Sequence, residues 1–166
     1  PHAFGNGNPY SRVSFQVRGF VSPMPQVTDL VIALRATYQM QSRKTPVHSM
    51  PTMTFTDTDE EGLGGLRTLR GYRQNRFVGP SASFINAEVR WMPMKFRIAG
   101  QHFGLGLVPF VDVGRVYDRV DFAFRNWRLG SGAGLRIAWN QATIVVADYG
   151  VSTEDRTFGL VFGHHF

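Results

Sequence analysis

The stretch that decides the fold is Gly62-Leu63-Gly64-Gly65-Leu66-Arg67-Thr68-Leu69-Arg70-Gly71-Tyr72, followed by Gly79-Pro80. It is too rich in glycine and arginine to be a strand or a core helix, yet long strand-like segments flank it. We therefore interpret it as a structured loop. The arginine at position 70 carries a permanent charge and five hydrogen-bond donors, so if it faces inward it requires carboxylate partners. Glu88 and Asp112, further along the chain, are the candidates.

Length and composition indicate a single all-β domain spanning residues 1–166. The chain has 14 Phe, 5 Tyr and 3 Trp, and its 18 Gly with 9 Pro favour turns over helices. No run of about 18 apolar residues is present, which excludes a conventional transmembrane helix. Cysteine is absent, and this carries little weight for the choice of compartment.

The net charge of +6 is compatible with a nucleic-acid surface or an anionic membrane surface. The basic residues do not cluster, however, and no motif typical of nucleic-acid binding is present. They recur singly within alternating segments, which fits a polar lumen better than a phosphate-binding stripe and predicts no nucleic-acid partner. These residues are Arg18, Arg35, Arg90, Arg115 and Arg136.

Seven segments alternate apolar and polar residues with the period of a β-strand. Several approach the roughly 9–11 residues that a strand needs to cross a bilayer. Glu88 and Asp112 fall on the faces opposite the aliphatic stripes of their segments, so both are predicted to point into a lumen. Pro93 is expected to begin a turn region that continues to Gly104. The predicted strands are residues 11–22, 28–41, 82–92, 105–117, 129–139, 142–151 and 157–166.

These segments predict a transmembrane antiparallel β-barrel with one long loop, residues 42–80. Bacterial single-chain barrels usually have an even number of strands, so we expect eight. The eighth strand would come from residues 1–10, from residues 53–58, or from sequence upstream. The connections after Asp118 differ in length, as expected when short turns lie on one side of a membrane and longer loops on the other.

From about Leu63 to Phe166 the chain resembles the outer-membrane assembly-factor superfamily, the bacterial surface antigen barrels that include BamA, TamA and the two-partner secretion transporters. Five elements in the same order carry the similarity. They are Gly-Gly-x-x-x-Leu-Arg-Gly-Tyr at Gly64–Tyr72, the glutamate strand at Glu88, Phe-x-Asp-x-Gly at Phe110–Gly114, the glycine-alternating strand at Gly130–Leu135, and the terminal Phe166.

The resemblance implies roles for individual residues. Leu69, Arg70, Gly71 and Tyr72 would form a structural loop motif whose arginine tucks into the barrel. Glu88, Asp112 and Gly114 would be its partners in the lumen, and Phe158, Leu160, Phe162 and Phe166 would form a C-terminal targeting strand. Full members of the family carry polypeptide-transport-associated (POTRA) domains before a barrel of sixteen strands, so we expect a minimal version without them. Because an eight-stranded barrel is just wide enough for side chains, it stays open whether the long loop lies in the lumen or outside.

Other chemistry finds less support in the sequence. His164 and His165 would face opposite sides of a strand, and the other histidines are scattered, so neither a metal site nor a cofactor is expected. Gly130–Gly134 superficially resembles a nucleotide-binding loop, but no helix or lysine follows it. Asp148, with a nearby histidine and serine, is where an enzymatic site would lie, and no catalytic residue is predicted. The alternative fold is a soluble β-sandwich. It would place the apolar faces of the strands inside and the faces that carry arginines, glutamate and aspartate outside.

The expected function is that of a small barrel in a bacterial outer membrane, assisting the insertion or transport of protein or lipid. Its expected partners are outer-membrane lipids and nascent outer-membrane proteins. The alternative is a structural or interaction barrel that acts through its outer loops or as a homodimer. In that case the residues around Arg70 would serve stability alone.

Overall fold

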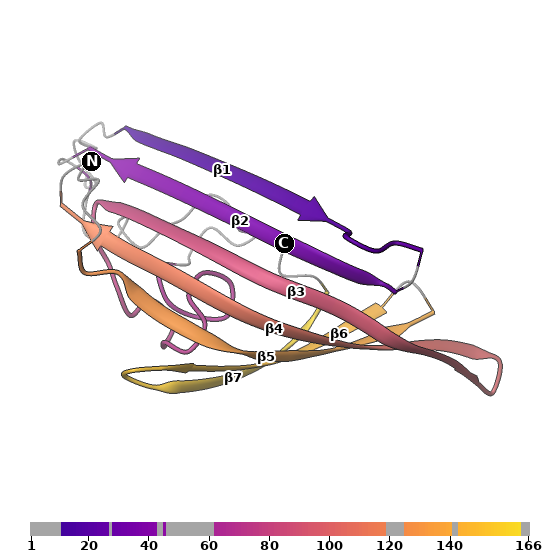
Figure 1. The fold of residues 1–166 in the computed structure, drawn as a ribbon. Coiled ribbons are helices and arrows are strands. Elements are labelled where there is room, and N and C mark those ends of the chain that lie inside the picture. Colours follow the sequence, from indigo (N-terminus) through magenta and orange to yellow (C-terminus); the bar gives the residue numbers. More distant parts are fainter. Residues whose placement is uncertain are drawn as a thin grey trace, which may run out of the picture.

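The computed structural model describes residues 11–26, 28–42, 45, 62–118, 125–140 and 143–163. In these ranges the chain forms one antiparallel sheet in which each strand pairs with the next along the sequence, in the order β1-β2-β3-β4-β5-β6-β7 (Figure 1). The seven predicted strands are confirmed. Their bounds are β1 (Arg12–Val21), β2 (Leu30–Gln41), β3 (Ser81–Ile98), β4 (Gln101–Tyr117), β5 (Arg128–Trp139), β6 (Thr143–Ser152) and β7 (Arg156–Phe162).

The two faces of the sheet differ in polarity, with the apolar face exposed. On the outer face Val17, Phe158 and Phe162 are 69, 71 and 72% exposed. On the inner face Asp112 and Asp148 are completely buried. A soluble domain rarely exposes an apolar surface that extends over a whole sheet, so this face is suited to a lipid environment. Among the described residues, no helix has the length and apolar character needed to cross a membrane.

The region from Pro93 to Gly104 corrects one prediction. Instead of a long turn, β3 continues to Ile98 and β4 begins at Gln101. Pro93 lies where the pairing register shifts between Trp91 and Met94, and at such a bulge a missing N–H need not cost a ladder hydrogen bond. The hairpin closes through Ala99 and Gly100, both at positive φ of 49° and 80°, the geometry that favours a two-residue hairpin.

The sheet is not closed within the described residues. Strands β1 and β7 each pair with one neighbour there, β2 and β6 respectively. Residues 1–10 and 53–58, proposed as sources of an eighth strand, lie outside the described residues. The eighth strand therefore stays a prediction.

The part of the β2–β3 loop that begins at Gly62 folds back on itself. Isolated bridges join Leu63 to Phe77 and Gly65 to Leu69. Leu63, Leu69 and Tyr72 are at most 1% exposed and form a small core with Ala82 and Phe84 of β3. The loop is thus packed against the inner face of the sheet, and its hydrophobic side chains replace solvent there.

Glycines on β5, β6 and β7 allow this close approach. A Cβ added to Gly130 would collide with the carbonyl oxygen of Arg70, and one added to Gly159 would collide with Leu66. A Cβ on Gly150 would lie 2.5 Å from the backbone nitrogen of Gly71. Gly130 of β5 and Gly150 of β6 therefore provide the surface on which the loop backbone lies.

Replacing Gly130 with Ala should displace the loop, because the methyl group would occupy the space of a backbone carbonyl. We expect the free energy of unfolding to fall by about 1–3 kcal/mol, measured by urea unfolding in lipid vesicles. Gly19→Ala on β1 is the matched control, since no atom lies within 4 Å of its added Cβ. Equal stability of the two variants would contradict the described contact.

Candidate functional site

Arg70 lies at the centre of a buried polar network on the inner face of the sheet. Its side chain is 2% exposed. Its Nε donates to Oδ2 of Asp112 over 2.7 Å and its Nη2 to Oδ1 over 2.8 Å, which makes a two-point contact between the guanidinium and the carboxylate. The backbone N–H of Arg70 also donates to Oδ2 of Asp112 over 3.0 Å. Asp112 therefore fixes both the side chain and the loop backbone.

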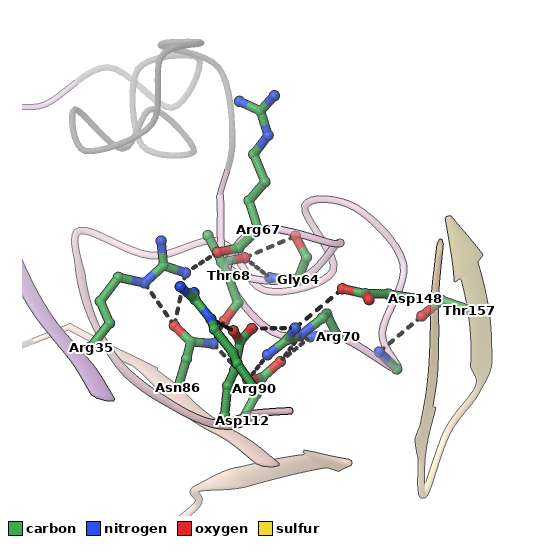
Figure 2. A network of polar contacts seen from close by, with 12 residues as sticks. Arg35, Gly64, Arg67, Thr68, Arg70, Asn86, Arg90, Asp112, Asp148 and Thr157 are labelled. Atoms are coloured by element: carbon green, nitrogen blue, oxygen red, sulfur yellow. Dashed lines mark hydrogen bonds and ion pairs between the residues drawn. The ribbon is translucent and has the colours of Figure 1, made fainter. Parts of the chain in front are cut away.

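Two further carboxylates meet the same guanidinium. Nη1 of Arg70 lies 2.7 Å from Oε1 of Glu88 and 3.2 Å from Oδ2 of Asp148. The three acids come from β3, β4 and β6, so one side chain of the loop bridges three strands. Figure 2 shows Arg70 pointing toward Asp112, with Asp148 on its other side. The ring of Phe110 lies beneath, its centroid 3.5 Å from Cζ of Arg70.

The sequence prediction brought together two of these acids and missed the third. Glu88 and Asp112 lie where the resemblance implied, in contact with Arg70. Asp148 had been considered only as a place for enzymatic chemistry. The sequence did contain a signal for Asp148, because the alternation of residues 142–151 places it on the inward face together with Val146. Sequence alone could not show that the sheet curls enough for β6 to reach the loop.

Additional arginines share these carboxylates. Nε of Arg90 donates to Oε2 of Glu88 over 2.9 Å, and Nη2 of Arg136 donates to Oδ2 of Asp148 over 3.2 Å. Each of these acids thus bridges Arg70 to a second guanidinium. A Cβ at Gly134 would collide with Oδ1 of Asp148, so the absence of a side chain there makes room for the Asp148–Arg136 pair.

A second branch of the network runs through Asn86, which faces Asp112 directly across β3 and β4. Its Nδ2 donates to Oδ1 of Asp112 over 2.8 Å and to the carbonyl of Thr68 over 2.9 Å. Its Oδ1 accepts from Nε and Nη2 of Arg35 over 2.9 and 2.8 Å, and Arg35 also donates to the carbonyl of Arg67 (Figure 2). The sequence prediction placed Arg35 in the lumen but assigned Asn86 no role. Both hold the loop from the β2 side.

The remaining predicted loop residues have structural contacts of their own. Leu69 is fully buried, and Gly71 has a φ of 91°, a left-handed conformation that favours glycine. The N–H of Gly71 donates to Oγ1 of Thr157 over 2.9 Å, and its carbonyl accepts from Oγ of Ser152 over 2.7 Å. The hydroxyl of Tyr72 donates to the carbonyl of Leu129 over 3.2 Å. The loop tip is therefore attached to β5, β6 and β7.

Gly114 and the described residues of the predicted C-terminal targeting strand take no part in the Arg70 network. Gly114, expected beside Arg70, instead faces Leu63: its added Cβ would lie 2.9 Å from Cδ1 of that leucine. It makes room for the hydrophobic core of the loop. Phe158, Leu160 and Phe162 are 71, 56 and 72% exposed on the outer face, while Phe166 lies outside the described residues.

The electrostatics keep Arg70 charged. Burial opposes the protonated form, but the hydrogen bond to Asp112 and the charges of the three acids outweigh it and raise the pKa of Arg70 above its ordinary value. At the exposed rim Arg73 pairs with Asp155 over 2.6 Å and Arg76 with Glu154 over 2.8 Å. The N–H of Arg156 and the Arg73 guanidinium hold the pKa of the Asp155 carboxyl below its usual value. Such exposed pairs contribute little stability.

The arrangement as a whole acts as a cross-link rather than as a reactive centre. Each of the three buried carboxylates accepts hydrogen bonds from arginine. Its evident physical effect is to fasten the loop to the strands.

Comparison with known proteins identifies the family of the chain. Residues 2–166 match the family model of the Omp85 superfamily domain, and the chain belongs to that superfamily. Members of this family are non-enzymatic barrels of membrane assembly and transport, in the outer membrane of Gram-negative bacteria or of organelles. Searches of curated proteins and of solved structures found no match.

Replacing Arg70 with Ala should leave three carboxylates buried without their central cation. Removing one member of a buried ion pair costs about 3–5 kcal/mol, and we expect a loss of that order in the free energy of unfolding in vesicles. Arg70→Lys should recover only part of it, because an ammonium group cannot make the two-point contact.

The matched control is Arg73→Ala, which removes the neighbouring arginine of the same loop. Its side chain is 81% exposed, so its loss should cost at most about 1 kcal/mol. If Arg70→Ala were no more harmful than Arg73→Ala, the network would not carry the stability assigned to it.

Proposed function

We propose that the protein is part of a transmembrane β-barrel of a bacterial outer membrane that assists the insertion or transport of protein or lipid. The observation that carries this proposal is the loop fastened by Arg70 to the inner face of a sheet whose outer face is apolar. A lipid-facing sheet with exposed edges is unstable in hydrocarbon, which favours a closed barrel. Membership of the Omp85 superfamily supports the general role, and the substrate is our inference.

The direction of the strands restricts how such a barrel closes. In a series of antiparallel neighbours, β1 and β7 run in the same direction. Antiparallel closure therefore needs an odd number of additional strands between them. One such strand would give the eight predicted from the sequence.

The position of the loop argues for a wider barrel. The interior of an eight-stranded barrel is just wide enough for side chains. Here the inner face also holds a folded loop, with Leu63, Leu69 and Tyr72 buried in it. We infer that the wall has at least three strands beyond the seven described.

Spin labels test the width of the barrel, and the absence of native cysteine makes labelling specific. One label replaces Phe158 on β7, and the second replaces Val13, Phe15, Val17 or Val21 on β1, all exposed on the outer face. With one strand between them, β1 and β7 would be about 10 Å apart, since neighbouring strands are about 4.8 Å apart. We expect no strong dipolar broadening for any pair in bilayers. Strong broadening in one of the four pairs would support eight strands.

The assembly role is tested by a folding assay in vesicles that contain the protein. An outer-membrane barrel protein is added unfolded in urea, and its folding is followed by the change in gel mobility without boiling. We expect folding to be faster than in empty vesicles. In the described region β7 pairs only with β6 and has seven residues. We propose that its other edge closes the barrel weakly and opens to let a client strand attach.

Variants distinguish an assembly role from a purely structural one. Arg70→Ala, inserted in equal amounts, should lose the acceleration while Arg73→Ala keeps it. If the wild-type protein gives no acceleration, the assembly role is contradicted, and a structural or interaction barrel, acting through its loops or as a homodimer, takes its place.

A further inference from the structure

A hydrophobic groove interrupts the polar inner face of the sheet. Its apolar lining consists chiefly of Val31, Met92, Val108 and Ile144, from four different strands, and its volume is about 260 Å³. Val108 is 1% exposed, so the floor is well packed. This apolar floor lies next to the arginines and carboxylates of the Arg70 network. Hydration of such an apolar surface is unfavourable, so an apolar ligand would gain free energy by covering it.

The groove extends beyond this first hollow. A second hollow of about 450 Å³ shares Met92 and Lys95 with it and continues past Arg97 and His102 toward the β3–β4 hairpin. The space exists because β4 carries glycines here. A Cβ at Gly104 would lie 3.0 Å from Sδ of Met92, and one at Gly106 would lie 3.7 Å from its Cε. A flexible methionine thus forms the wall that the two hollows share.

The groove borders the cationic side of the Arg70 network. That network joins four arginines (Arg35, Arg70, Arg90 and Arg136) to three carboxylates (Glu88, Asp112 and Asp148), through ion pairs and through Asn86. Arg90 and Arg136 are its more accessible cations, with side chains 27% and 11% exposed against 2% for Arg70. Both line the groove. The Lys95–Asp29 pair at the other end is neutral as a whole.

We propose that this groove binds a single-chain anionic amphiphile derived from membrane lipid. Its alkyl chain lies on Val31, Met92, Val108 and Ile144, and its anionic head lies beside Arg90 and Arg136, whose guanidinium groups attract it. The apolar lining takes no part in the contacts that fasten the loop, whereas Arg90 and Arg136 belong both to that network and to the proposed site. The inference does not depend on the assembly role, because binding is measured on the folded protein alone.

Methionine methyl resonances provide the test, with the protein in lipid nanodiscs. The Met92 resonance, identified by its loss in Met92→Leu, is followed during addition of dodecyl phosphate. Dodecyltrimethylammonium has the same chain with the opposite charge, and inorganic phosphate has the head without the chain. Met94, 49% exposed, is the internal control for effects of the bilayer.

We expect dodecyl phosphate alone to shift the Met92 resonance in a saturable way, while Met94 responds alike to both amphiphiles. Ile144→Glu, which adds a negative charge to the groove, should weaken this binding by about tenfold or more. Ile98→Glu, at the exposed end of β3, should leave it unchanged. Gel mobility without boiling confirms that both variants are folded.

Four outcomes would overturn the proposal. The first is a Met92 resonance that does not respond to dodecyl phosphate, and the second is an equal response to both amphiphiles. The third is a response only after deletion of residues 2–10, which would identify the chain itself as the occupant. A response to inorganic phosphate alone would reduce the site to an anion site and would equally contradict an amphiphile.

Discussion

The permanent positive charge of Arg70 is the constraint on which the rest of the inner face depends. A guanidinium that is 2% exposed requires anionic partners, and the chain provides one from each of β3, β4 and β6. Because β4 and β5 separate β3 from β6 in the sheet, satisfying one side chain fixes the curvature of the sheet and the position of the loop together. Arg90, Arg136 and the Arg35–Asn86 branch then hold the acids and the loop backbone from the sides.

This polar centre is compatible with folding because the usual distribution of residues is reversed. The outer face exposes aromatic and aliphatic side chains to lipid, so the sheet gains little by collapsing around an apolar core. In a soluble core, side chains fill the space between packed layers. Here Gly130, Gly150 and Gly159 leave that space to the loop, whose backbone and leucine atoms lie directly on the strands. The loop is thus a packed layer of the structure, and we infer that the wall around it is wider than eight strands.

Much of this could be predicted from the sequence, since alternation alone located seven strands and the inward faces of Glu88 and Asp112. What it could not predict depends on curvature and on local backbone geometry. Asp148 lay on the correct face, but only the curl of the sheet brings β6 to Arg70. Pro93 was interpreted as the start of a turn, whereas a bulge accommodates it and β3 continues to Ile98. Gly114 was assigned to Arg70 by family resemblance, and the structure places it against Leu63.

The most direct test of the central claim is a double-mutant cycle between Arg70 and Asp112, measured as the free energy of urea unfolding in lipid vesicles. The variants are Arg70→Gln, Asp112→Asn and the double substitution. If the loop is held by this pair, the double variant should be more stable than the sum of the single losses implies, by about 1–3 kcal/mol. Additivity within about 0.5 kcal/mol would contradict the account, because the two residues would then contribute independently.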